Sequence, residues 1–208
     1  MELRVAKNNI FINSITKQEK NSLPKPKLTF YTLFWIFFIG CILGVVLETI
    51  YCYIILHRIE SRAGVIYGPF NPVYGFGAVA LTLLLYQLQH KKPLTIFAYS
   101  MLIGAIFEYL CSLFQEKAFG TVSWEYSDTF LNFAGRTNLF YAIAWGFLGL
   151  FWMKIGFPIF GSFLEKIPKR IAIPITTILL VFMIFNLTIS SMAAIREQER
   201  RHRTSSRY

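Results

Sequence analysis

The chain alternates between long apolar stretches and short polar ones. One apolar stretch, 28–49, holds a single charged residue, Glu48, and the apolar character continues to Leu56. Three further runs hold no charge at all, at 63–89, 137–153 and 171–195. About 20 apolar residues are needed to cross the hydrocarbon core of a bilayer. The pattern therefore predicts an all-α, polytopic bundle of transmembrane helices.

We expect about five spans within one transmembrane domain, 28–195. They cover about residues 28–56, 72–89, 94–114, 138–157 and 171–195. A polar, basic N-terminal tail (1–27) and a basic C-terminal tail (196–208) flank this domain. The fourth apolar segment runs on to about Phe163, so it is tilted, broken at Pro158 or continued along the interface.

A proline- and glycine-rich stretch interrupts one apolar run. Residues 67–77 read YGPFNPVYGFG. Proline removes a backbone donor and clashes one turn back, so this stretch is not the middle of a regular helix. Broken backbone at membrane depth must be covered by protein or line a wet cavity. It is either an apolar turn leading into a helix or a partly re-entrant segment that shapes a site, and it could add a sixth crossing.

The net charge of +10 sits in the tails and in short loops. That placement is typical of residues that set membrane topology and meet anionic lipid. It predicts an N-terminus inside the cell, and we expect membrane lipids rather than nucleic acid as partners. Three cysteines, an odd number, argue against a disulfide framework. The histidines show no metal-ligand spacing, and we expect neither a metal nor a cofactor.

Two glutamates lie within apolar helices. Gly40, Gly44 and Glu48 share one helical face, and Gly104 and Glu108 repeat that spacing. Each carboxylate should lie roughly 12–13 Å below the surface at about 1.5 Å per residue. Ionisable groups at this depth are costly unless paired. The candidate partners are Arg62 and Arg136, and each pair is either a structural clamp or part of a substrate or ion pathway.

Aromatic and polar loop residues supply further candidates. Trp124 and Tyr126 fit an interfacial aromatic belt. Tyr74 and Trp145 fit a belt less well, because each precedes a glycine and opens a span. Asn132 and Arg136 could bind an anionic group at a helix start.

Two short sequence matches predict a chain built from two related halves. GVVLE at 44–48 matches GAIFE at 104–108, and YGF at Tyr74 matches WGF at Trp145. Such halves would be parallel repeats, an arrangement that places a transporter's site at the repeat interface.

Several chemistries are absent from the sequence. It holds no G-x-x-x-x-G-K-[ST] loop for ATP, no G-x-S-x-G elbow and no H-E-x-x-H motif. No enzyme activity is therefore assigned. Paired carboxylates and arginines still leave open acid–base work on a lipid headgroup.

Several motifs together resemble a family. YGPFNPVYGFGAV, FEYLCSLFQEKAFGTVSWEYS, NFAGR and WGFLG occur in the order found in the CmpB-like bacterial membrane proteins described as putative ABC-transporter permease, type IV. The resemblance covers about residues 40–149. It implies functional or structural importance for Glu48, Arg62, Tyr67, Gly68, Pro69, Tyr74, Gly75, Glu108, Tyr109, Glu116, Trp124, Tyr126, Asn132, Gly135, Arg136 and Trp145.

The chain departs from the family pattern in its loops. It has Arg62-Ala63 in place of Arg-Gly, Glu125 in place of Asp, Phe130-Leu131-Asn132 in place of Pro-Phe-Asn, and Thr137 in place of a hydrophobic residue.

The resemblance implies a transporter permease in a bacterial plasma membrane, with a separate ATPase subunit if transport uses ATP. A homo-oligomer is also open. The alternatives are a membrane-embedded enzyme acting on a lipid or lipid-linked substrate, and a structural or regulatory membrane subunit.

Overall fold

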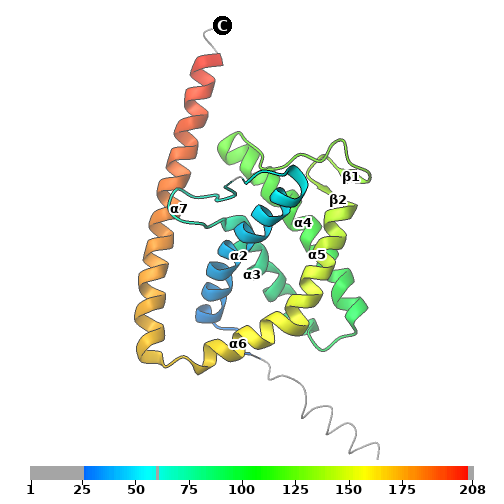
Figure 1. The fold of residues 1–208 in the computed structure, drawn as a ribbon, viewed down its shortest axis with the longest axis vertical. Coiled ribbons are helices and arrows are strands. Elements are labelled where there is room, and N and C mark those ends of the chain that lie inside the picture. The colour runs from blue at the N-terminus through cyan, green and yellow to red at the C-terminus, as the bar shows by residue number, and fades with distance from the viewer. Residues whose placement is uncertain (1–25, 60, 206–208) are drawn as a thin grey trace, which may run out of the picture.

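The computed structural model describes residues 26–59 and 61–205, and it is predominantly helical with almost no strand (Figure 1). Within these residues, four helices are long and apolar enough to cross a membrane, and the apolar segment Pro72–Leu88 is shorter. This confirms the predicted bundle of about five helices. The elements are α2 (Phe30–Leu56), α3 (Pro72–Leu85), the 3₁₀ turn η1 (Tyr86–Leu88), α4 (Pro93–Phe119), β1 (Asn132–Phe133), β2 (Thr137–Asn138), α5 (Leu139–Phe151), the π-helical turn η2 (Trp152–Gly156), α6 (Phe157–Lys166) and α7 (Lys169–Ser205).

The bundle has two chemically different ends. At one end Lys154 donates to the carbonyls of Gln89 and Lys91, and the Lys27 amide donates to Glu165. We call this the basic end. The opposite end, where α2 ends at the left-handed cap His57 and α4 ends at Gly120, holds the sequence-predicted loop residues, and we call it the site end. Most of the N-terminal tail lies outside the described residues.

The segment between α2 and α3 turns back into the bundle. The Asn71 amide donates to the carbonyl of Cys41, at 3.1 Å. Cys41 lies about 24 Å along α2 from His57, at about 1.5 Å per residue. The chain therefore returns to the middle of the bundle before α3 starts, which is the re-entrant geometry. In Figure 1 this cyan segment reaches across to α7.

Helix α3 begins directly after Asn71, at a residue pair that favours the start of a helix. Asn71 accepts from the Val73 amide as the N-cap, and Pro72 occupies the first turn, where it displaces no hydrogen bond. The break therefore ends at Asn71, and Gly75 and Gly77 lie inside the helix. Both glycines are buried, because other helices approach them closely.

The fourth apolar segment is bent rather than straight. It passes from α5 through the π-helical turn η2 into α6, which runs along the basic end in Figure 1. Pro158 sits in the first turn of α6. The expected break at Pro158 is therefore wrong: the helix bends at the π-helical turn ahead of Pro158 and continues along the end of the bundle.

Helix α7 stands at the side of the bundle and runs from the basic end to the site end (Figure 1). The Trp35 indole donates to Thr176, at 3.0 Å, and Met183 packs in a cluster with Phe70. The helix continues to Ser205, so the described part of the basic C-terminal tail is helical and not a separate segment.

Candidate functional site

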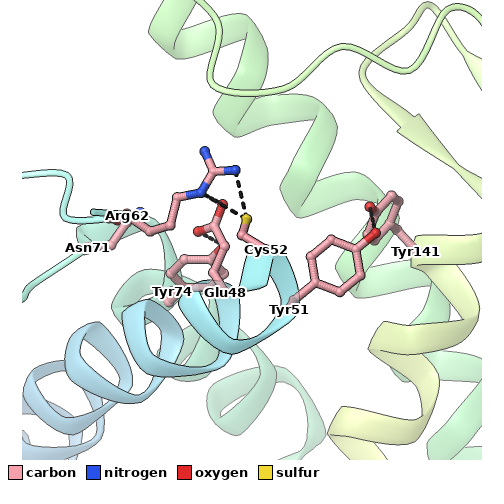
Figure 2. Close-up of polar contacts among 7 residues, drawn as sticks. All are labelled: Glu48, Tyr51, Cys52, Arg62, Asn71, Tyr74 and Tyr141. Carbon is pink, nitrogen blue, oxygen red and sulfur yellow. Dashed lines mark hydrogen bonds and ion pairs between the residues drawn. The ribbon is translucent and has the colours of Figure 1, made fainter. Parts of the chain in front are cut away.

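The first polar cluster joins α2, α3 and the re-entrant segment. The Tyr74 hydroxyl donates to the Glu48 carboxylate, and Arg62 Nε lies 3.6 Å from Glu48 Oε1. Arg62 also donates to Cys52 Sγ through Nε and Nη2, at 3.1 and 2.8 Å. Figure 2 shows the four side chains converging. One guanidinium therefore bridges two successive turns of α2.

This cluster depends on close packing of α2 against α3. A Cβ on Gly44 would lie 2.1 Å from the ring of Tyr74, and a Cβ on Gly40 would lie 3.2 Å from the Cα of Gly75. Small residues let two helices approach. The glycines therefore admit the Tyr74 ring, which places its hydroxyl on Glu48.

The second polar cluster joins α4, the β-hairpin and α5. The Thr137 hydroxyl donates to Glu108 Oε2, at 2.9 Å, and the Trp145 indole is a second hydrogen-bonding neighbour. A Cβ on Gly104 would lie 2.1 Å from the ring of Trp145. Gly104, Glu108 and Trp145 therefore repeat the arrangement of Gly44, Glu48 and Tyr74.

The arginines of the two clusters differ in their acidic partners. Arg136 donates to Ser112 Oγ, at 2.9 Å, and forms an ion pair with Glu116. The expected pairing of Arg136 with Glu108 is therefore wrong. Helix α4 extends to Phe119 and so carries Glu116 about two turns nearer the site end than Glu108, and the connection that holds Arg136 places the guanidinium beside Glu116.

The connection between α4 and α5 is a folded hairpin that fixes Arg136. The Trp124 indole donates to the Arg136 carbonyl, at 2.9 Å, and the Tyr126 amide donates to the Gly135 carbonyl, at 2.8 Å. Strands β1 and β2 pair antiparallel, with Phe133 opposite Thr137. The hairpin therefore sets the positions of both Arg136 and Thr137.

Asn132 is engaged within this hairpin. Its side-chain nitrogen donates to the carbonyls of Ser127 and Thr129, at 3.0 and 2.9 Å. The start of α5 is capped instead by Asn138, which accepts from the Tyr141 amide. Asn132 therefore stabilises the connection.

Three tyrosines lie between the two clusters. The hydroxyls of Tyr51 on α2 and Tyr141 on α5 are 3.4 Å apart (Figure 2). The Tyr141 ring stacks on Tyr126, with centroids 4.7 Å apart. Burial, with the charge of Glu108 as the next cause, raises the pKa of Tyr126. Its hydroxyl therefore stays protonated at neutral pH.

Tyr67 lies apart from both clusters. Its backbone is hydrogen-bonded to Asn186 of α7, and its ring stacks on Phe185 with centroids 6.3 Å apart. Tyr67 therefore belongs to the contact between the re-entrant segment and α7. Within the described residues, no group of three or more His, Cys, Asp or Glu side chains could hold a metal ion.

Sequence reasoning missed Cys52, Ser112, Thr137, Tyr51, Tyr141 and Asn186. Cys52 and Ser112 had a readable signal, because each follows its glutamate by four residues and so extends the Gly–Glu spacing by one turn. For Asn186 the signal was weaker: it is the one asparagine in the charge-free run 171–195.

The comparisons with known proteins identify a family. The family model described as putative ABC-transporter type IV matches residues 35–191, which include both polar clusters. Neither the curated proteins nor the solved structures that were searched gave a match.

Proposed function

Because this chain belongs to the putative ABC-transporter type IV family, we propose that it is the membrane component of a transporter whose substrate path runs through the two polar clusters. The observation that carries the proposal is the pair of glutamates, Glu48 and Glu108, in equivalent places on two glycine-packed helix pairs. Intramembrane ionisable residues of this kind mark substrate or ion pathways.

The position of the clusters supports a path between the halves. Tyr51 and Tyr126, from different halves, both contact Tyr141. Transporters built from parallel repeats place their site where the repeats meet. The substrate path would be lined or shaped by Glu48, Arg62, Tyr74, Glu108, Arg136 and Trp145. The connection between α4 and α5 would be held by Glu116, Trp124, Tyr126 and Asn132.

The charges of the loops between the helices support one topology, and the arginines at the C-terminal end of α7, which lie at the site end, run against it. The basic end would face the cytoplasm, because it holds Lys27, Lys91, Lys92, Lys166 and Lys169. The N-terminus would then be cytoplasmic, the site end would open outward, and the membrane would be the bacterial plasma membrane. The exposed apolar side chains of α7, such as Ile178 and Val181, would meet lipid or a second copy.

Energy would come from a separate ATPase subunit. The test is purification from native membranes in mild detergent, with mass spectrometry of the proteins and lipids that co-purify. A stoichiometric ATPase supports the proposal. One strongly enriched lipid species without an ATPase contradicts it and favours an enzyme or carrier acting on that lipid.

Variants then separate a functional site from a clamp. Glu48→Gln that folds as the parent protein does but loses transport in the reconstituted complex supports a path through the cluster. Loss of the folded protein from membranes would instead make the Glu48–Arg62 pair a structural clamp. The matched control is Glu199→Gln, which removes one carboxylate from α7, outside both clusters.

A further inference from the structure

The two glutamates occupy equivalent places but have different partners. Glu48 is ion-paired with Arg62 and accepts from Tyr74. Glu108 is 9% exposed and accepts from the hydroxyl of Thr137, with the indole of Trp145 beside it. Both of these donors are neutral. Glu108 therefore has a carboxylate in the place equivalent to Glu48, but within the described part of the chain no cationic side chain is paired with it as Arg62 is with Glu48.

Arg136 precedes Thr137, the donor to Glu108, but its own guanidinium is bonded elsewhere. The guanidinium donates to Ser112, one turn further along α4, and is ion-paired with Glu116, one turn further again. The stretch from Trp124 to Arg136 fixes its backbone as well, because the Trp124 indole donates to the Arg136 carbonyl. The arginine therefore neutralises Glu116 and leaves Glu108 uncompensated.

The remaining titratable groups around Glu108 cannot replace a cation. Cys111 lies on the same helix, Tyr126 on the connection and Tyr141 on α5, and each is close enough to interact electrostatically with the Glu108 charge. All three are neutral when protonated and anionic when deprotonated. None of them stabilises a carboxylate by opposite charge.

An ionised carboxylate taken out of water without a cation is costly, and such a group holds a proton instead. We propose that Glu108 is a proton-binding site that takes up and releases a proton, while Glu48 stays an ion-paired carboxylate. The inference deepens the proposed function and rests on it for its role, because proton exchange would then occur within the substrate path. Its chemistry can be tested without a transport assay.

The test is labelling of the full-length protein in membranes with dicyclohexylcarbodiimide, followed by peptide mass spectrometry. The carboxyl proton passes to a carbodiimide nitrogen while the carboxylate oxygen bonds the central carbon, and the adduct retains all atoms of both reactants. Only a protonated acid reacts. We expect labelling at Glu108 that falls as pH rises, with no labelling at Glu48.

A second measurement guards against poor access of the reagent. Infrared difference spectra between acidic and alkaline pH should show the carbonyl band of a protonated acid, and Glu108→Gln should remove it. Absence of both the adduct and the band overturns the proposal, as does equal labelling of Glu48. Loss of labelling on adding Na⁺ or K⁺ at constant pH would support it, because a cation can abolish the reaction only by displacing a proton already bound to the carboxylate. An absent ATPase partner changes none of these outcomes, so the two proposals fail separately.

Discussion

The side chain of Asn186 is hydrogen-bonded to both polar groups of the Tyr67 peptide. Asn186 Nδ2 donates to the Tyr67 carbonyl, at 2.7 Å, and the Tyr67 amide donates to Asn186 Oδ1, at 3.1 Å. Ser190, one turn along α7, accepts from the Ile66 amide. An irregular backbone in a membrane must find such partners. Helix α7 therefore supplies the hydrogen bonds that let the re-entrant segment exist.

Replacing Asn186 should loosen this segment. Asn186→Leu keeps a similar volume but leaves the Tyr67 amide and carbonyl without their partners, at about 1–3 kcal/mol for each unsatisfied group. We expect a lower melting temperature in detergent and faster proteolysis between residues 62 and 71. Thr188→Val is the control, since Thr188 is exposed and, among the residues that the structure describes, bonds only the Ile184 carbonyl of its own helix. Equal effects of the two substitutions would contradict the proposed anchor.

The contact between Gly44 and Tyr74 should tolerate no added side chain. Gly44→Ala puts a Cβ where the Tyr74 ring lies, and overpacking of this kind costs about 1–3 kcal/mol. We expect the same loss for Gly104→Ala against Trp145. Thermal unfolding measures both variants.

The double variant Gly44→Ala/Tyr74→Ala tests the cause, because removing the ring should offset part of the loss and give non-additive effects. Leu47→Ala, at an exposed position on α2, is the control. Full additivity would mean that the clash is not the source of the instability.

The equivalence of Cys52 and Ser112 gives a substitution that should be harmless. Each accepts hydrogen bonds from the arginine of its own half. Cys52→Ser should therefore keep the Arg62 contact and the stability of the parent. Cys52→Val removes the acceptor and should destabilise by about 1.5–3 kcal/mol, the range for a hydrogen bond to a charged group. Indistinguishable melting curves for the serine and valine variants would rule out a role for the sulfur as an acceptor.

Hydrophobic patterning was sufficient to predict the bundle. The expected span 72–89 agrees with α3 and η1. The depth to which the segment before α3 enters the bundle could not be predicted from the sequence. It depends on hydrogen bonds from Asn71 to Cys41 and from Tyr67 to Asn186, and nothing in the local sequence encodes partners so far away in the chain.

The site was predicted in part for the same reason. The spacing of Gly44 and Glu48, repeated by Gly104 and Glu108, pointed to two carboxylates that face neighbouring helices. It could not assign the arginines, because the choice of Arg136 between Glu108 and Glu116 is set by the hairpin from Trp124 to Arg136. Three-dimensional placement of a loop, and not spacing along a helix, decides that pairing.

The outer connection should respond to acid through Glu125. Hydrogen bonds from the Ser127 hydroxyl and amide hold the pKa of Glu125 below its ordinary value of 4.5. A lowered pKa stabilises the folded turn at pH values above the unfolded pKa, and that contribution is lost as pH falls through the folded pKa. The Ser127 amide chemical shift should therefore change in acid. Glu125→Gln should abolish this change and Asp128→Asn should keep it, and the opposite pattern would assign the transition to Asp128.

The ion pair between Glu116 and Arg136 should control the state of Glu108. Glu116→Gln removes the carboxylate that draws the guanidinium toward the site end, and Glu108 is the nearest remaining carboxylate on the same face of α4. Arg136 should then move to Glu108 and favour its ionised form. We expect labelling of Glu108 by dicyclohexylcarbodiimide at neutral pH to fall several-fold, while Glu199→Gln leaves it unchanged. Unaltered labelling in a folded Glu116→Gln protein would show that the hairpin alone keeps Arg136 away from Glu108.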